Sequence, residues 1–263
     1  MSPESVARVA GAPPHVAVEG RRSSVGDPLA HMIPLHADVM SAYSSDMVSR
    51  TPPLSAYTRQ ERRLIQSLRT PLQVQRHLRA LPYNWEKTLR TFRGAVQHGR
   101  AHCLEAVLFA AAVLEHHGYP PTVLDIESQD GLDHVLFLFR HGGRWGTVAR
   151  SRDYGLHGRP PVFRSVRALV ASYMDPYVDG SGRVNGYGTT NLDALVTSDW
   201  RLGARNVWAV ERALIDMPHA SVHMPDARYS RTLARYLPFK AGAKEHTRPA
   251  MRRVYGKQVD LWW

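Results

Sequence analysis

Hydrophobic positions recur at helical spacing over the stretch that follows the first fifty or so residues. A first helix is predicted from Thr58, where apolar positions begin to share one face. Thr70 and Pro71 then supply a cap and a proline at the first position of a second helix, which Pro82 ends. A third helix is predicted to close at Gly99 and to contain four apolar positions at helical spacing: Trp85, Leu89, Phe92 and Val96.

Residues 103–118 are apolar on nearly every side, as expected of a central helix that other elements cover. Gly118 is the expected stop of this helix. Three strand-like runs follow, and the hairpin-turn signals Asp130-Gly131 and Gly142-Gly143 separate them. The pattern therefore predicts a buried helix followed by an antiparallel meander, with strands at residues 122–126, 134–139 and 144–148.

Further helices are predicted downstream at residues 165–173, 206–215 and 229–236. The N-terminal region carries Pro, Gly, Ser and Ala without a sustained period, which is typical of a poorly ordered arm. We find no internal repeat. The expected organisation is an N-terminal arm (1–54), a core domain (55–216) and a C-terminal extension (217–263).

The chain has 263 residues, of which 43% are hydrophobic, as is ordinary for a globular protein. No apolar run approaches the roughly 18 residues that a membrane helix requires. The N-terminus lacks the basic-then-apolar pattern of a secretory signal. We therefore expect a cytoplasmic protein without a membrane segment, and export by a route that needs no such signal stays open.

The formal net charge is +11, and all but four of the 34 basic residues are arginines. These arginines are spread thinly along the chain, without a dense block or a nucleic-acid-binding motif, so a compositional bias explains them more simply than nucleic-acid binding. An acidic substrate or partner fits the charge equally well. The sequence carries no signal for an oligomeric state.

Cys103 is the only cysteine, and it stands at the start of the predicted buried helix. Unpaired N–H groups and the helix macrodipole favour a thiolate there, and an adjacent imidazole favours it further. His134, which begins the second strand, is the candidate base that takes the thiol proton. The alternatives are a cysteine that packs as a small hydrophobe and a histidine hydrogen-bonded at a strand end.

Several short motifs, taken in order and at their separations, resemble the transglutaminase-like superfamily, in particular its bacterial members of unassigned role. The resemblance covers residues 70–175 and implies an α+β fold with a papain-like core. In such a core a cysteine-bearing helix packs on an antiparallel sheet that carries the histidine, and additional N- and C-terminal helices are expected here. The motifs are Leu81-Pro-Tyr-Asn84, Cys103-Leu-Glu105, Gly118-Tyr-Pro-Pro121, Asp133-His134-Val-Leu136, Arg144-Trp145-Gly146 and Arg159-Pro-Pro-Val162.

The third member of a catalytic triad departs from this resemblance. The superfamily usually places an aspartate a few residues after the tryptophan, where this chain has Ala149. Ser151 and Asp153 are the nearest groups that accept a hydrogen bond from the His134 imidazole. Charge favours Asp153 and similarity to the subgroup favours Ser151, while a turn residue is the plain alternative for Asp153.

Three further residues are candidates for oxyanion or substrate binding. Gln97 is a candidate second oxyanion donor beside the Cys103 N–H, or a solvated residue near a helix end. Trp145 is a candidate wall of the substrate channel, or a core residue. Glu105 either complements the helix N-terminus or positions substrate.

The sequence predicts no cofactor and no metal site. Its 14 histidines form no His-Glu-x-x-His pattern, one cysteine cannot build a thiolate-rich zinc site, and no phosphate-binding loop is present.

The leading hypothesis is cysteine-dependent acyl transfer on an amide or ester, including those of peptides and proteins. Release to water defines a peptidase, amidase or deamidase, and release to an amine defines a transglutaminase-type enzyme. The alternative is a non-catalytic binding module that retains the fold. A third hypothesis is a protein delivered into another cell, with the N-terminal arm as its export region.

Overall fold

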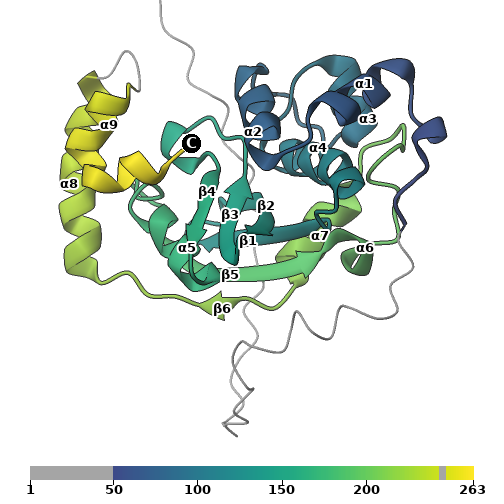
Figure 1. Ribbon diagram of the computed structural model, residues 1–263. Helices are drawn as coiled ribbons and strands as arrows, with labels where there is room; N and C mark the ends of the chain where they lie inside the picture. Colours follow the sequence, from purple (N-terminus) through teal and green to yellow (C-terminus); the bar gives the residue numbers. More distant parts are fainter. Residues whose placement is uncertain (1–49, 243–246) are drawn as a thin grey trace, which may run out of the picture. The chain divides into compact units, whose positions relative to one another are not determined.

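A six-stranded antiparallel sheet organises residues 50–242 and 247–263, which are the residues that the computed structural model describes. The strand order is β4-β3-β2-β1-β5-β6, with helices on both faces (Figure 1). The α+β class is therefore confirmed, whereas the predicted arm lies outside the described residues except for 50–54. The strands are β1 (Thr122–Ser128), β2 (His134–His141), β3 (Arg144–Val148), β4 (Arg159–Phe163), β5 (Val184–Asn191) and β6 (Ala220–Ser221).

The predicted meander forms the centre of this sheet. Strands β1, β2 and β3 pair in sequence order, with Asp125 opposite Val135 and Phe137 opposite Val148. Both turns use glycines in the left-handed region, where Gly131 has a φ of 71° and Gly142 a φ of 55°. These are backbone conformations that residues with a Cβ rarely adopt, so the two Gly-containing signals in the sequence specify the meander.

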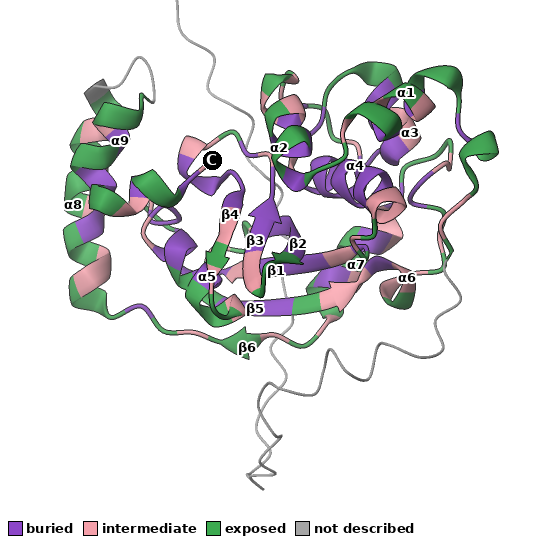
Figure 2. Ribbon diagram, in the orientation of Figure 1, coloured by how far each residue is buried: buried purple, intermediate pink, exposed green. Residues whose placement is uncertain are grey.

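The helix that begins at the cysteine is the central helix of the fold. Every residue of α4 after Cys103 is buried, which Figure 2 shows as a continuous purple ribbon. Two shorter helices beside it begin as the sequence predicts, because Thr58 and Thr70 each form a capping box with the residue three positions later. The bounds are α1 (Arg59–Ser67), α2 (Pro71–Ala80), α3 (Phe92–His98), α4 (Cys103–Leu114) and η2 (Glu115–His117).

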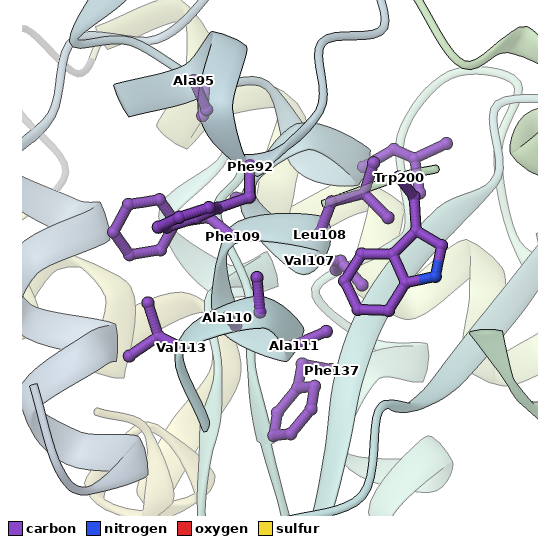
Figure 3. Close-up of a cluster of buried hydrophobic side chains, with 14 of the residues drawn as sticks. Phe92, Ala95, Val107, Leu108, Phe109, Ala110, Ala111, Val113, Phe137 and Trp200 are labelled. Carbon is purple, nitrogen blue, oxygen red and sulfur yellow. The ribbon is translucent and has the colours of Figure 1, made fainter. Parts of the chain in front are cut away.

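Two hydrophobic clusters lie on opposite faces of the sheet. Odd-numbered β2 residues such as Phe137 pack against α4, together with the aromatic side chains Phe92, Phe109 and Trp200 (Figure 3). Even-numbered ones such as Leu136 pack against α5 (Val166–Met174), which Ser165 caps as predicted. The period of two along the strand sorts the side chains between the two layers.

The prediction for the third helix is partly wrong. Helix α3 begins at Phe92, with Thr91 as its cap, and the preceding turn of predicted helix is absent. Trp85, expected on the buried face, is 71% exposed. The reason lies in polar contacts that helical spacing does not reveal: side chains of residues 84 and 88 and the N–H of residue 90 all bind the buried carboxylate of Glu105.

Strands β4, β5 and β6 have no counterpart among the predicted elements. Strand β5 pairs with the whole of β1 although it contains Gly186 and Gly188. A Cβ at Gly188 would lie 2.6 Å from the Met217 side chain and 2.9 Å from the Pro218 carbonyl oxygen, so close chain approach requires glycine there. Because glycine has a low β propensity, a prediction based on propensity misses this strand.

The C-terminal segment packs on the core. Trp263 stacks on Phe139 of β2 at a centroid distance of 5.8 Å, and Arg79 of α2 donates to the Trp263 carbonyl oxygen. No helix in the described ranges is long and apolar enough to cross a membrane. The remaining helices are η1 (Leu54–Ala56), η3 (Tyr154–Leu156), α6 (Leu192–Leu195), α7 (Trp208–Asp216), α8 (Asp226–Gly242), α9 (Arg248–Tyr255) and η4 (Gly256–Leu261).

Candidate active site

The Cys103 thiol occupies the first position of α4 and is half-buried, whereas the rest of the helix is sealed in the core. Its backbone N–H makes no hydrogen bond with any described residue. The sulfur therefore lies at the positive end of the most buried helix, beside an N–H group that is free to donate.

Two imidazoles act on the Cys103 sulfur. Burial raises the pKa of the Cys103 thiol, but hydrogen bonds with His102 and His134, and the positive charges of both rings, lower it to about 6. The structure thus brings Cys103 and His134 together although 31 positions separate them in the sequence. It also adds His102, which sequence reasoning did not propose as a partner of the sulfur.

His134 is buried at the start of β2 and is oriented by a backbone group. Its Nε2 lies 2.8 Å from the carbonyl oxygen of Leu156. A carbonyl only accepts, so Nε2 carries the hydrogen and Nδ1 is the ring nitrogen left for the sulfur. The orienting group is therefore a peptide carbonyl on the short helix η3.

In the part of the chain that the structure describes, neither of the two residues predicted to orient His134 hydrogen-bonds with its ring. The Ser151 hydroxyl accepts from the Asp153 N–H at 3.0 Å. The Asp153 carboxylate is half-exposed and lies 3.6 Å from the guanidinium of Arg152. Asp153 does serve the turn, because its carbonyl accepts from the Leu156 N–H at 3.1 Å. Both candidates thus build the segment that presents the Leu156 carbonyl, which corrects the expected triad.

The fully buried Arg159 holds the segment that contains Leu156 in place. Its guanidinium donates to the carbonyl of Gly155 at 2.6 Å and to that of His157 at 2.8 Å, on either side of Leu156. The rings of Tyr173 and Trp262 lie 4.1 and 4.5 Å from its Cζ. Burial lowers the pKa of Arg159 to about 10, and no carboxylate in the described ranges pairs with it. Arg159 thus connects the C-terminal Trp262 with the segment whose Leu156 carbonyl accepts from His134.

His102 precedes the cysteine and is held differently. Its Nε2 lies 2.7 Å from the carbonyl oxygen of Thr88 and 3.7 Å from Oε1 of Glu105. Burial lowers the pKa of His102, but the hydrogen bond to Cys103, the thiolate charge and the Glu105 carboxylate raise it to about 9. This ring therefore holds its proton at neutral pH.

Glu105 is fully buried, and its carboxylate accepts four hydrogen bonds. They come from the Asn84 amide (2.9 Å), the Thr88 hydroxyl (2.8 Å), the Arg90 N–H (2.9 Å) and the His102 N–H (3.2 Å). A carboxylate offers about four acceptor directions, so none is left for a substrate. These contacts favour the alternative prediction for Glu105, a role at the helix N-terminus, over the positioning of substrate.

Among the described residues, no hydrogen bond or ring contact joins the other two substrate-binding candidates to Cys103 or to its two histidines. Gln97 is exposed in the last turn of α3, and its amide makes no hydrogen bond within residues 50–242 and 247–263. Trp145 lies on β3 and packs with the cluster on the α5 face, opposite the face that α4 covers, where Arg140 lies 5.5 Å from its ring. These positions favour the plain alternatives, a solvated glutamine and a packed tryptophan.

An aromatic pair stands closer to the thiol. Burial raises the pKa of the Tyr83 phenol and the charge of Cys103 raises it further, so this ring lies within electrostatic reach of the sulfur. Tyr83 meets the exposed Trp85 edge-on, with ring centroids 4.9 Å apart. Trp85, which the sequence places in the third helix, is instead an exposed side chain packed on Tyr83.

Within the part of the chain that the structure describes, no three side chains from His, Cys, Asp and Glu are grouped as a metal site would require. Comparison of the chain with protein-family models and with curated proteins finds no match. The chemistry of the site is therefore argued from its geometry.

Proposed function

We propose that this protein is a cysteine-dependent acyl-transfer enzyme with a papain-like core of the transglutaminase-like type. The observation that carries the proposal is one half-buried sulfur, at the N-terminus of a buried helix, whose pKa two neighbouring imidazoles lower. A thiolate at neutral pH is the nucleophile that amide and ester chemistry needs. An inert structural cysteine is instead enclosed by apolar groups.

The reaction proceeds in two balanced halves. His134 takes the thiol proton, and the thiolate forms a bond to the substrate carbonyl carbon while the Cys103 N–H donates to the developing oxyanion. The carbon–nitrogen or carbon–oxygen bond then breaks, and His134 returns the proton to the leaving group. In the second half His134 takes a proton from water or an amine, which attacks the thioester and regenerates the thiolate.

A non-catalytic binding module is the second candidate, and one observation favours it. The far nitrogen of His134 meets a neutral carbonyl where a triad of this type uses a carboxylate. A carbonyl stabilises an imidazolium less than a carboxylate does, so turnover is expected to be slower than with an acidic third member.

Alkylation with iodoacetamide separates the two candidates. We expect Cys103 to react at pH 7 at least tenfold faster than free cysteine, with a rate that rises through pH 6, because its thiol pKa is about 6. Cys103→Ala is the control that shows how much label binds elsewhere.

A second experiment looks for the acyl-enzyme. Mass spectrometry should detect a thioester on Cys103 after incubation with activated esters, and adding primary amines distinguishes transfer from hydrolysis. Slow alkylation that His134→Ala leaves unchanged would favour the binding module.

A further inference from the structure

The two histidines on the Cys103 sulfur have unequal partners. Glu105 is a fully buried carboxylate, and such a charge requires a countercharge as well as hydrogen bonds. Among the described residues no Lys or Arg side chain lies within ion-pair distance of it, since the nearby Arg90 guanidinium binds Glu86. Within residues 50–242 and 247–263, the cationic partner of Glu105 is the His102 ring, at 3.7 Å between Nε2 and Oε1.

Hydrogen-bond geometry gives the same assignment. Nε2 of His102 faces the Thr88 carbonyl at 2.7 Å, and a carbonyl accepts only from a protonated nitrogen. Nδ1 is then the ring nitrogen left for the sulfur, as at His134, and a thiolate likewise only accepts. A ring that donates from both nitrogens is an imidazolium. His134 also donates through Nε2, but no carboxylate in the described ranges pairs with its ring.

We propose that His102 is a permanently protonated imidazolium that stabilises the thiolate of Cys103 whenever the sulfur is not acylated, and that His134 alone carries the transferred proton. This inference rests on the proposed function and divides its two tasks between the two rings. His102 gains and loses no proton in the cycle, so every proton taken from the thiol, water or amine resides on His134.

Other titrating groups face this pair from several elements. Glu105 lies on α4 with the cysteine, and His134 lies on β2. The phenols of Tyr83, before α3, and of Tyr177, after α5, are within electrostatic reach of the sulfur. Burial raises the pKa of both phenols, so they stay neutral at pH 7. The charges of the two rings then act on the thiolate, and Glu105 acts on His102.

The test replaces each ring with a fixed positive charge or with a neutral amide in the full chain. The pH dependence of iodoacetamide alkylation measures the thiol pKa. His102→Gln should raise the thiol pKa by about one to two units and slow alkylation at pH 7 roughly tenfold. His102→Lys should keep the pKa within about half a unit of the wild type, because a cation is restored. His98→Gln, at an exposed histidine on α3, is the matched control and should leave the rate unchanged.

The proton-carrying task needs the opposite pattern at the other ring. His134→Lys should also preserve thiolate, yet it should abolish turnover of an amide substrate, because an ammonium cannot cycle a proton at neutral pH. His102→Lys should retain measurable turnover. Equal loss of turnover in the two lysine variants would overturn the division of tasks.

A measurement on the wild type keeps the inference testable if the variants unfold. In an NMR titration with ring nitrogens labelled, His102 should show protons on both nitrogens up to about pH 8. A His102 ring that loses its proton below pH 7, or a thiol pKa that His102→Gln leaves unchanged, would overturn the inference while the proposed function stands. A wild-type thiol that titrates near 9 would instead remove the proposed function.

Discussion

The two sides of the Cys103 sulfur are built in different ways. On the His102 side, all the groups that fix the ring come from residues 84–105, and the charge of Glu105 dominates. On the His134 side, a neutral carbonyl at Leu156 fixes the ring, and Arg159 and the C-terminal Trp262 support it. The comparison shows that a local segment supplies charge to the nucleophile, whereas distant segments supply the geometry of proton transfer.

The electrostatic difference has a physical basis. A buried carboxylate beside an imidazole favours the charged ring, while a carbonyl dipole orients a ring without fixing its charge. A ring that must exchange protons works best when neither state is held strongly. Each imidazole therefore has the partner that suits its proposed task, and substitutions on the two sides should separate ionisation from turnover.

The largest expected effect comes from removing His134. His134→Ala should lower turnover of an amide substrate by roughly 10³-fold, because proton transfer to the leaving group contributes about that much. Alkylation at pH 7 should fall by less than tenfold, since His102 still holds the thiolate. Parallel rates of amide hydrolysis and alkylation test this, and an equal fall in both would contradict the comparison.

The next effect is expected at Arg159, which reaches the site only through the carbonyls beside Leu156. Arg159→Met should leave the Gly155 carbonyl without its buried donor and the His157 carbonyl with the Tyr173 hydroxyl alone, at a cost of about 3 kcal/mol in the free energy of unfolding. Turnover should fall roughly 30-fold as the His134 ring loses its fixed orientation, with little change in the thiol pKa. Urea unfolding and alkylation profiles measure the two parts.

Arg159→Lys is the control for charge at this site. A lysine keeps the positive charge but lacks the fork that spans two carbonyls, so it should not restore turnover. Full recovery with lysine would show that charge, and not the two-carbonyl clamp, is what the site requires.

A third prediction removes the carboxylate on the other side. Glu105→Gln should slow alkylation at pH 7 by roughly tenfold, because His102 loses its countercharge and releases its proton at lower pH. Turnover should fall in proportion to the thiolate lost, without a further orientation defect. Comparing alkylation and turnover rates checks this proportionality, which the Arg159 variant should violate.

The pH dependence of stability offers a fourth and smaller test. The raised pKa of His102, about 9, contributes stability that is complete below pH 6.5 and is lost as pH rises towards 9. The lowered pKa of Cys103, about 6, contributes stability that is present above pH 9 and is lost as pH falls through 6. The two slopes have opposite sign between these values, so the pair should add almost no pH dependence there.

Removing the sulfur breaks that cancellation. In Cys103→Ala, the contributions of Cys103 to the raised pKa of His102 are gone and that of Glu105 remains, so the free energy of unfolding should fall above pH 6.5 only by the part that Glu105 contributes. Chemical denaturation at a series of pH values measures the slope. A wild-type slope as steep as that of the variant would show that the two shifts are not linked.

The smallest effect is expected at Gln97. Gln97→Ala should change the free energy of unfolding by less than about 0.5 kcal/mol, because its side chain is exposed. Turnover should stay within twofold of the wild type, as for a residue that touches neither imidazole. A tenfold fall in turnover would restore Gln97 as an oxyanion donor.

Much of the α4 face could be predicted from local signals. Capping residues at 58 and 70, the apolar run after Cys103 and the glycine turns of the meander each act within a few positions, so the sequence displays them directly. The prediction of the third helix was wrong at residues 84–91, because polar groups of these residues hydrogen-bond to the Glu105 carboxylate. The His102–Glu105 spacing of three was visible, but only the buried environment makes it an ion pair.

The sequence by itself determined that a lone cysteine begins a buried helix and that a histidine begins the second strand, because helix caps and strand periodicity are short-range properties. The tertiary structure alone decided which groups face the two rings. Every residue has the same backbone carbonyl, so the amino-acid sequence does not indicate that the carbonyls of Leu156 and Thr88 accept from His134 and His102. Packing of segments distant in sequence, including the Arg159 clamp, makes that choice.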